Sequence, residues 1–334
     1  MNCFLSIVIP VYNAKEFLDF NFASLLDQDV SNDYYEIICV DDGSTDGSGD
    51  LLDQYAERYS NIKVIHQENA GHANARNAGM DIAQGKYIWF VDADDCIDRK
   101  CIGFIVENME AYDIGVMSIR HVLFHNDGEV PTTAASYKYA PCARPNPSPC
   151  SGIRIFNLEL LKANNIRWKP ELGASDDLIF CFFAETYAEN VVYIDSVGYY
   201  HRKWSGSVTG KKDLGTDKRY IKSHIMIANI FKNELSNPRY TKKQIGNLKL
   251  RIKQCAQAVL TMAAMIGDKA FINETLKDLR EQDLYPYAFI WSNLIPHISL
   301  KRTLLDWSIF LFPIKAYYKL YCALFRKLHL THNY

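Results

Sequence analysis

Over the first hundred residues, compact apolar runs alternate with segments of helical pattern. Compact apolar runs occur at Leu5–Val11, at Tyr35–Val40, near Ile62–Ile65 and from Tyr87 onward. The segments between them carry apolar or small residues at helical spacing. This alternation is typical of a parallel sheet flanked by helices, so we predict an α/β fold. In such sheets ligands bind outside the carboxyl ends of the strands.

The fourth apolar run, within Tyr87–Asp95 (YIWFVDADD), ends in three carboxylates. In an extended chain Asp92 and Asp94 point to the same side, with the small Ala93 between them. Two carboxylates so close repel each other unless a cation lies between them, and oxygen ligands suit Mg²⁺ or Mn²⁺. A solvated acidic turn has the same three-residue pattern, so this motif alone leaves both interpretations open.

Composition limits the class of protein. The chain has 334 residues, of which 48% are hydrophobic and 23% charged, enough for one large domain or two smaller ones. A net charge of -2 gives no support for nucleic-acid binding. Nine scattered cysteines without a CxxC pair favour reduced thiols and a cytoplasmic location over disulfides or zinc. The N-terminal run lacks a basic region and is interrupted by Pro10, which predicts a first strand and not a signal peptide.

Three local patterns have alternatives that can be weighed. The loop Asp41–Asp50 partly matches an EF-hand, but a strand pattern precedes it and the last ligand position holds Asp53 in place of Glu. No GxGxxG follows the first strand, which disfavours a nicotinamide or flavin site. Asn13 followed by Glu16 resembles a capping box and predicts a helix start.

Four motifs in one order and spacing resemble glycosyltransferase family 2. They are SIVIPVYN, DDGSTDGS, NAGHANARNAG and the strand ending in DADD, all within about the first 100 residues. The resemblance implies a GT-A fold, a Rossmann-like, mostly parallel sheet with a helical C-terminal extension. It also implies that Pro10 and Tyr12 border the nucleotide base and that Asp42 holds the uracil or ribose. Arg76 would lie near the nucleotide, and Asp92 and Asp94 would bind the metal on the diphosphate.

The chemistry of these side chains agrees with such roles. A planar base needs a surface for stacking, a ribose needs hydrogen-bond acceptors, and a diphosphate needs cations. Tyr12 could instead be a core aromatic, and Arg76 could form a surface ion pair. Small residues on both sides of Arg76 favour close helix packing with the guanidinium emerging into the site.

A second acidic motif begins the stretch SDDLIF. Ser175 can cap a helix whose first turn holds Asp176 and Asp177, a favourable place for acids. The family usually has Glu-Asp followed by an aromatic residue, and here the pair is Asp176-Asp177 with Phe180. The resemblance implies that Asp177 is the catalytic base.

The segment YYHRKWSGSVT resembles the family's Tyr-aromatic-Arg motif. His201 could ligate the metal as a neutral imidazole or contact the phosphates, and Arg202 could neutralise the diphosphate. The family more often has Tyr at the position of His201, so a buried, hydrogen-bonded histidine remains an equal interpretation.

We expect four segments. Residues 1–110 would form the nucleotide-sugar-binding half of the GT-A domain, and residues 111–210 the half that binds the acceptor and carries the catalytic base. A helical extension at 211–284 and an amphipathic basic segment at 285–334 would follow. The proline-rich stretch 126–151 is expected to be a loop, and the resemblance suggests that it borders the acceptor. Lysines, Asp306 and Pro313 interrupt any 18-residue apolar span near the C-terminus, so we do not expect a transmembrane helix there. The basic, aromatic stripe at 301–328 predicts peripheral contact with a membrane, and packing on the catalytic domain or in a homodimer is the alternative.

The resemblance therefore implies an inverting enzyme that moves one sugar from a nucleotide-diphosphate sugar, with UDP preferred, to a hydroxyl group. The expected acceptor is a glycan or lipid-linked glycan in surface polysaccharide synthesis. Two alternatives stay open: a nucleotidyltransferase acting on sugar phosphates, and a catalytically silent nucleotide-sugar-binding module.

Overall fold

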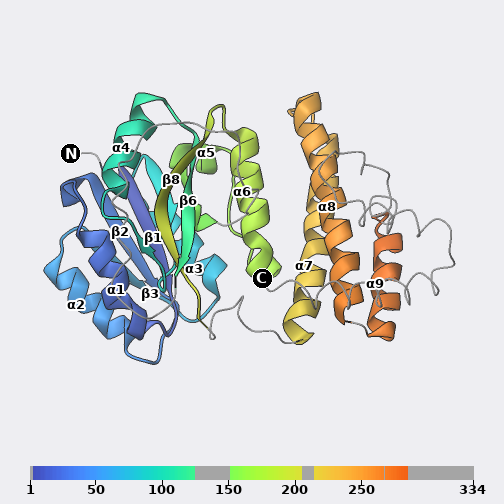
Figure 1. Ribbon diagram of the computed structural model, residues 1–334, viewed down its shortest axis with the longest axis horizontal. Coiled ribbons are helices and arrows are strands. Elements are labelled where there is room, and N and C mark those ends of the chain that lie inside the picture. Colours follow the sequence, from blue (N-terminus) through green and yellow to red (C-terminus); the bar gives the residue numbers. More distant parts are fainter. Residues whose placement is uncertain (1–2, 125–150, 205–213, 267, 285–334) are drawn as a thin grey trace. The chain divides into compact units, whose positions relative to one another are not determined.

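The computed structural model describes residues 3–124, 151–204, 214–266 and 268–284 (Figure 1). The chain divides into two compact units, with the boundary between residues 211 and 212. The expected loop at 126–151 lies almost wholly outside the described residues. So does the basic segment 285–334 with its stripe at 301–328.

The first unit contains a sheet of eight strands. They are β1 (Leu5–Val11), β2 (Tyr35–Asp41), β3 (Ile62–His66), β4 (Tyr87–Phe90), β5 (Cys96–Ile97), β6 (Val116–Phe124), β7 (Arg154–Asn157) and β8 (Val191–Arg202). Their spatial order is β3-β2-β1-β4-β7-β6-β8-β5. Strands β1 to β4 are mutually parallel, as predicted, and β6 pairs with β8 in parallel. Strand β7 runs antiparallel to both β4 and β6, and β5 runs antiparallel to β8, so the sheet is mixed.

Helices cover both faces of this sheet (Figure 1). Those packed on one face are α1 (Lys15–Leu26), α2 (Ser48–Arg58) and α4 (Cys101–Ala111). Those on the other are α3 (His72–Ile82), α5 (Leu158–Ala163) and α6 (Asp176–Tyr187). Because β1, β2 and β4 are buried on both sides, their apolar runs are continuous instead of alternating. The α/β fold predicted from these runs is confirmed.

The parallel strands place several polar segments at one edge of the sheet. Tyr12 follows β1, Asp42 follows β2, Gln67 follows β3 and Asp92 lies two residues beyond β4. Because parallel strands end together, these four segments share the carboxyl edge.

The predicted capping box at the start of α1 is wrong. Asn13 has a left-handed backbone (φ 48°), and the N-cap residue is Ala14. The side-chain oxygen of Asn13 accepts a hydrogen bond from the Thr45 backbone at 2.8 Å, and the Ala14 amide donates to the Ser48 hydroxyl at 3.0 Å. Asn13 therefore joins two loops at the carboxyl edge and does not cap its own helix.

The second unit contains the predicted helical extension. It consists of α7 (Leu214–Asn233), α8 (Lys242–Ile266) and α9 (Lys269–Glu281), drawn in yellow to orange in Figure 1. Asp268 caps α9 by accepting hydrogen bonds from two backbone amides of its first turn. Among the described helices, none is both long and apolar enough to cross a membrane.

Candidate active site

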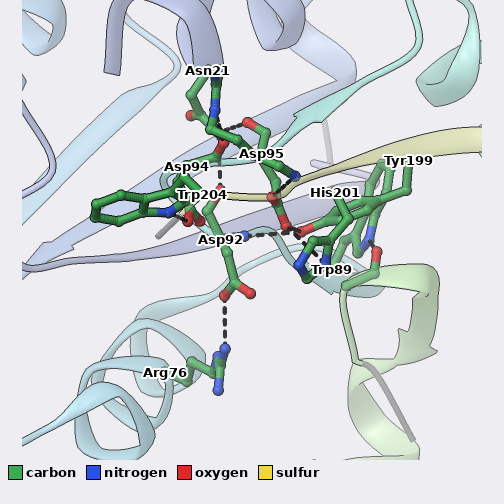
Figure 2. A network of polar contacts seen from close by, with 11 residues as sticks. Asn21, Arg76, Trp89, Asp92, Asp94, Asp95, Tyr199, His201 and Trp204 are labelled. Carbon is green, nitrogen blue, oxygen red and sulfur yellow. Dashed lines mark hydrogen bonds and ion pairs between the residues drawn. The ribbon is translucent and has the colours of Figure 1, made fainter. Parts of the chain in front are cut away.

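The three carboxylates after β4 lie on a tight turn. The strand ends at Phe90, and the Asp95 amide donates to the Asp92 carbonyl at 3.1 Å. The extended geometry predicted for Asp92 and Asp94 is therefore wrong, because the chain reverses between them. Figure 2 shows the outcome: the Asp92 side chain meets Arg76, and Asp94 meets Trp204.

Arg76 lies on α3 and pairs with Asp92, with 2.7 Å between Nη2 and Oδ1. Only 7% of the Arg76 side chain is exposed, against 39% for Asp92. Helix α3 approaches β1 so closely that a Cβ on Gly79 would collide with Val8, as its small residues predicted. Burial opposes ionisation of Asp92, but the Arg76 charge prevails and holds the pKa of Asp92 below its usual value. The pair is thus charged, with its carboxylate accessible.

Asp94 and Asp95 have different partners. Asp94 accepts a hydrogen bond from Trp204 Nε1 at 2.8 Å. The buried Asp95 accepts from the Tyr199 hydroxyl at 2.6 Å and from the Arg202 amide at 2.7 Å. Burial and the neighbouring carboxylates raise the pKa of Asp94, and raise that of Asp95 well above its usual value. The turn is therefore a place where added positive charge is favourable.

Two further predicted residues lie at the end of β8, beside this turn. The His201 Nδ1 is 3.8 Å from Asp95 Oδ2. Arg202 is buried, and its Nε donates to the Asp94 carbonyl at 2.7 Å. Its guanidinium lies over three aromatic rings, those of Phe17, Phe20 and Phe124, at 4.6 to 5.2 Å from their centroids. Both side chains are thus brought to the acidic turn.

The second acidic pair begins α6. The helix starts at Asp176 as predicted, but the Ser175 side chain makes no capping hydrogen bond. Asp176 is buried, and its Oδ1 accepts from the Asp177 amide at 2.8 Å. Asp177 Oδ1 has no hydrogen-bond partner within the described part of the chain. Burial raises the pKa of Asp177 to about 6; the charge of Arg76 and a hydrogen bond with Ser151 lower it, and the charge of Asp176 raises it. Asp177 is therefore a carboxylate suited to accepting a proton near neutral pH.

The residues expected around the nucleotide base lie at the ends of β1 and β2. Pro10 is within β1, paired with Val40, and the Tyr12 side chain after it is 54% exposed. Tyr12 is therefore not a core aromatic.

Asp42 is buried and accepts three hydrogen bonds, from the Gln67 side chain (2.7 Å) and the amides of Ala70 (2.9 Å) and Gly71 (2.8 Å). Its carboxylate thus fixes the loop that leads into α3.

Several residues of this site were not predicted from the sequence. Asn21 on α1 donates to the carbonyls of Asp92 (3.2 Å) and Asp95 (2.9 Å), and Tyr199 and Trp204 bind the acidic side chains. Their partners lie more than 70 positions away, so no local pattern indicates them.

Among the described residues there is no group of three or more His, Cys, Asp or Glu side chains arranged around one metal position.

Mg²⁺ and Mn²⁺ do not need such a group, since they commonly use one or two carboxylates together with water and substrate phosphate. The partly exposed Asp92 and Asp94 supply two hard oxygen donors in a turn that favours positive charge. The residues present therefore fit a divalent cation.

Comparison with known proteins relates this chain to a family and to a fold. The profile described as "Glycosyl transferase family 2" matches residues 6–161. The poly(ribitol-phosphate) beta-glucosyltransferase of Bacillus spizizenii is 32% identical over 212 residues, which are 59% of this chain and 32% of that protein. The chain spans less than two thirds of the length of the first curated relatives it matches, between 32% and 62%.

Two solved structures share the fold. Staphylococcus aureus TarS 1–349 in complex with UDP-GlcNAc superposes with a TM-score of 0.60 at 20% identity, covering 86% of this chain and 90% of that one. The mannosyltransferase PcManGT from Pyrobaculum calidifontis, in complex with GDP-Man and Mn²⁺, superposes with a TM-score of 0.51 at 17% identity, covering 85% and 81%.

Proposed function

Because this chain belongs to glycosyltransferase family 2 through its residues 6–161, we propose that it transfers a single sugar from a nucleotide-diphosphate sugar to an acceptor hydroxyl with inversion of configuration. One observation carries the proposal. Asp177 has an unpaired carboxylate oxygen and a pKa raised to about 6, and it lies within the electrostatic reach of Arg76, whose guanidinium pairs with Asp92. The positive charge of Arg76 thus acts both on the proton acceptor, Asp177, and on the turn that would bind the diphosphate.

The donor nucleotide binds at the carboxyl edge of β1 and β2 in this proposal. The exposed Tyr12 ring, next to Pro10, offers a surface for the base. Asp42 holds the adjoining loop with three hydrogen bonds, which leaves about one lone pair of its carboxylate for a ribose or uracil group. UDP is the preferred nucleotide because the TarS structure that shares this fold contains UDP-GlcNAc, although the second neighbour contains GDP-Man.

The diphosphate lies at the acidic turn. Asp92 and Asp94 would hold a divalent cation there, and when bound it would supply positive charge where the leaving group gains negative charge. His201 and Arg202, at the end of β8, extend the site on the other side of Asp95. Arg202 adds a permanent positive charge whose position is fixed by the three aromatic rings.

The chemical step follows from Asp177. Its carboxylate takes the proton of the acceptor hydroxyl while that oxygen forms a bond to the anomeric carbon. The bond from this carbon to the phosphate oxygen breaks, and its electron pair leaves with the nucleoside diphosphate. Attack from the face opposite the leaving group inverts the configuration. General base catalysis of this kind contributes roughly 10²- to 10⁴-fold in rate.

The acceptor is a glycan or a lipid-linked glycan of a surface polysaccharide. Support comes from the relative of B. spizizenii, named for transfer to poly(ribitol-phosphate), and from the basic, aromatic composition of residues 301–328. These residues would hold the enzyme at the membrane where a lipid-linked acceptor lies.

Two measurements test the function. Calorimetric titration of the full chain with UDP, UDP-sugars and GDP-mannose, with Mn²⁺ and with EDTA, gives the donor and the metal dependence. Incubation of the bound donors with poly(ribitol-phosphate) and with lipid-linked glycans, followed by NMR of the product, gives transfer and anomeric configuration. Retained configuration would contradict the mechanism, and metal-independent binding would contradict the role of the turn.

A further inference from the structure

Helix α3 is tied along its length to the segment that leads into α6. Asn77 binds the backbone of Trp168 twice, donating to its carbonyl and accepting from its amide, both at 3.0 Å. Asp81 forms a two-point ion pair with Arg167, at 2.6 and 2.9 Å. One more tie, made by His72, reaches the acidic pair itself.

The carboxylate of Asp176 links His72 to the backbone of Asp177, because each of its two oxygens makes one of two hydrogen bonds. Its Nε2 is 3.2 Å from Asp176 Oδ2, and the other oxygen of Asp176 accepts from the Asp177 amide at 2.8 Å. The Asp176 side chain is 2% exposed and the His72 side chain 40%. A histidine that merely filled the core would be buried, whereas this ring lies at the surface and reaches inward to a buried acid.

We propose that His72 is a positioning residue for the transfer reaction: its Nε2–H holds Asp176, and Asp176 in turn holds the Asp177 backbone so that the base keeps its place. This inference rests on the proposed function, in which Asp177 accepts the proton. A catalytic base displaced by about 1 Å can cost on the order of 100-fold in rate.

The charges support the same assignment. The hydrogen bond to Asp176 raises the pKa of His72, which favours its cationic form beside that acid. Asp176 raises the pKa of Asp177 through its own negative charge. A cationic His72 therefore forms a stronger hydrogen bond to the Asp176 carboxylate than a neutral ring would.

The experiment compares three variants of the full chain. His72→Leu removes the hydrogen bond, and His72→Gln keeps an N–H donor at similar reach but cannot act as a base. Asp81→Asn is the matched control, because it weakens another polar contact between α3 and the same segment without a link to Asp177. The measurements are kcat, the Kd of the donor, and the hydrogen-exchange rate of the Asp177 amide.

We expect His72→Leu to lower kcat about 10- to 100-fold with donor Kd within about twofold, and to speed exchange of the Asp177 amide about tenfold. In kcat and in the exchange rate, His72→Gln should stay within about fivefold of the wild type, and Asp81→Asn within about twofold. The proposal is overturned if His72→Leu keeps both the wild-type kcat and exchange rate, or if His72→Gln is as impaired as His72→Leu. A wild-type chain without transfer would contradict the proposed function instead, and the exchange rates would then decide the role of His72.

Discussion

Arg76 on α3 and Asp92 after β4 form an ion pair of 2.7 Å that links the two acidic clusters of the site. The Arg76 charge acts on Asp92, on Asp176 and on Asp177, and its guanidinium lies 4.6 Å over the Trp168 ring. Trp168 stacks on Phe180 of α6, with 4.1 Å between centroids. The acidic turn at Asp92–Asp95 and the helix that carries Asp177 are therefore built around one buried cation.

The acidic turn gives the first prediction. Asp92→Asn and Asp94→Asn should each abolish the gain in donor affinity that Mn²⁺ provides, because an amide is a much weaker ligand than a carboxylate. Titration with and without Mn²⁺ measures this. Glu107→Gln, an exposed substitution on α4, is the control and should bind as the wild type does. The metal assignment is wrong if both Asp variants keep Mn²⁺-dependent affinity.

The sequence predicts the donor side of the fold because its strands are buried on both faces. The runs of β1, β2 and β4 have no polar alternation, so each could be located within one or two residues. Strand β5 has only two residues, too few for any periodicity. Strand β7 is as short as β4, but Arg154 and Asn157 at its ends leave no continuous apolar run. Their antiparallel pairing makes the sheet mixed, and it depends on distant partners.

Candidate site residues could be predicted where they belong to local motifs, and not where they depend on long-range contacts. Asp92, Asp94 and Asp177 belong to local motifs. His72 meets its partner 104 positions away, and Asn21 lies 71 and 74 positions from the two carbonyls it binds. The turn at Asp92–Asp95 was also missed, because an acidic triplet carries no information on whether its chain is extended.

Asp42 gives a prediction about stability. An asparagine there replaces an acceptor oxygen with an NH₂ group, so at least one of the three donors from Gln67, Ala70 and Gly71 loses its partner. A buried unpaired donor costs about 1–3 kcal/mol. Asp42→Asn should therefore lower the free energy of unfolding by this amount in urea, and weaken donor binding. Asp50→Asn, exposed on α2, should stay within about 0.5 kcal/mol of the wild type. Wild-type stability of Asp42→Asn would show that the loop does not depend on this carboxylate.

The C-terminal composition gives a prediction about location. Residues 301–334 contain six Lys or Arg and one Asp, whereas the whole chain has a net charge of -2. Each basic residue near an anionic surface contributes up to about 1 kcal/mol. The full chain should sediment with anionic liposomes at low salt and less at high salt, and a chain ending near residue 286 should not. Lys315→Glu combined with Lys319→Glu should weaken binding, and neutral liposomes serve as the control. Equal sedimentation of both chains would argue against this segment as the contact.

The base gives a prediction about activity. Asp177→Asn should lower kcat about 10²- to 10⁴-fold while the donor Kd is unchanged, because an amide cannot accept the proton. Glu189→Gln, an exposed change just after α6, should leave kcat unaltered. With its pKa raised to about 6, Asp177 is ionised above that pH, so wild-type kcat should fall about tenfold per unit below pH 6. Transfer by Asp177→Asn within a few fold of the wild type would make Asp176 the candidate base.

The same carboxyl gives a prediction about stability and pH. The pKa of Asp177 is about 6 in the folded chain against a usual value of 3.8, so between these values the folded state binds more protons than the unfolded state. Stability from this group therefore falls as pH rises from 3.8 to 6, and above pH 6 the full penalty is present. Asp177→Asn removes the ionisation and should raise the free energy of unfolding by about 1–3 kcal/mol at pH 8, with little gain near pH 4. Urea titrations at the two pH values measure the difference, with Glu189→Gln as the control that should gain nothing at either. An equal gain at both pH values would mean that the amide stabilises α6 by packing or hydrogen bonding, and that the Asp177 carboxylate is not strained by its surroundings.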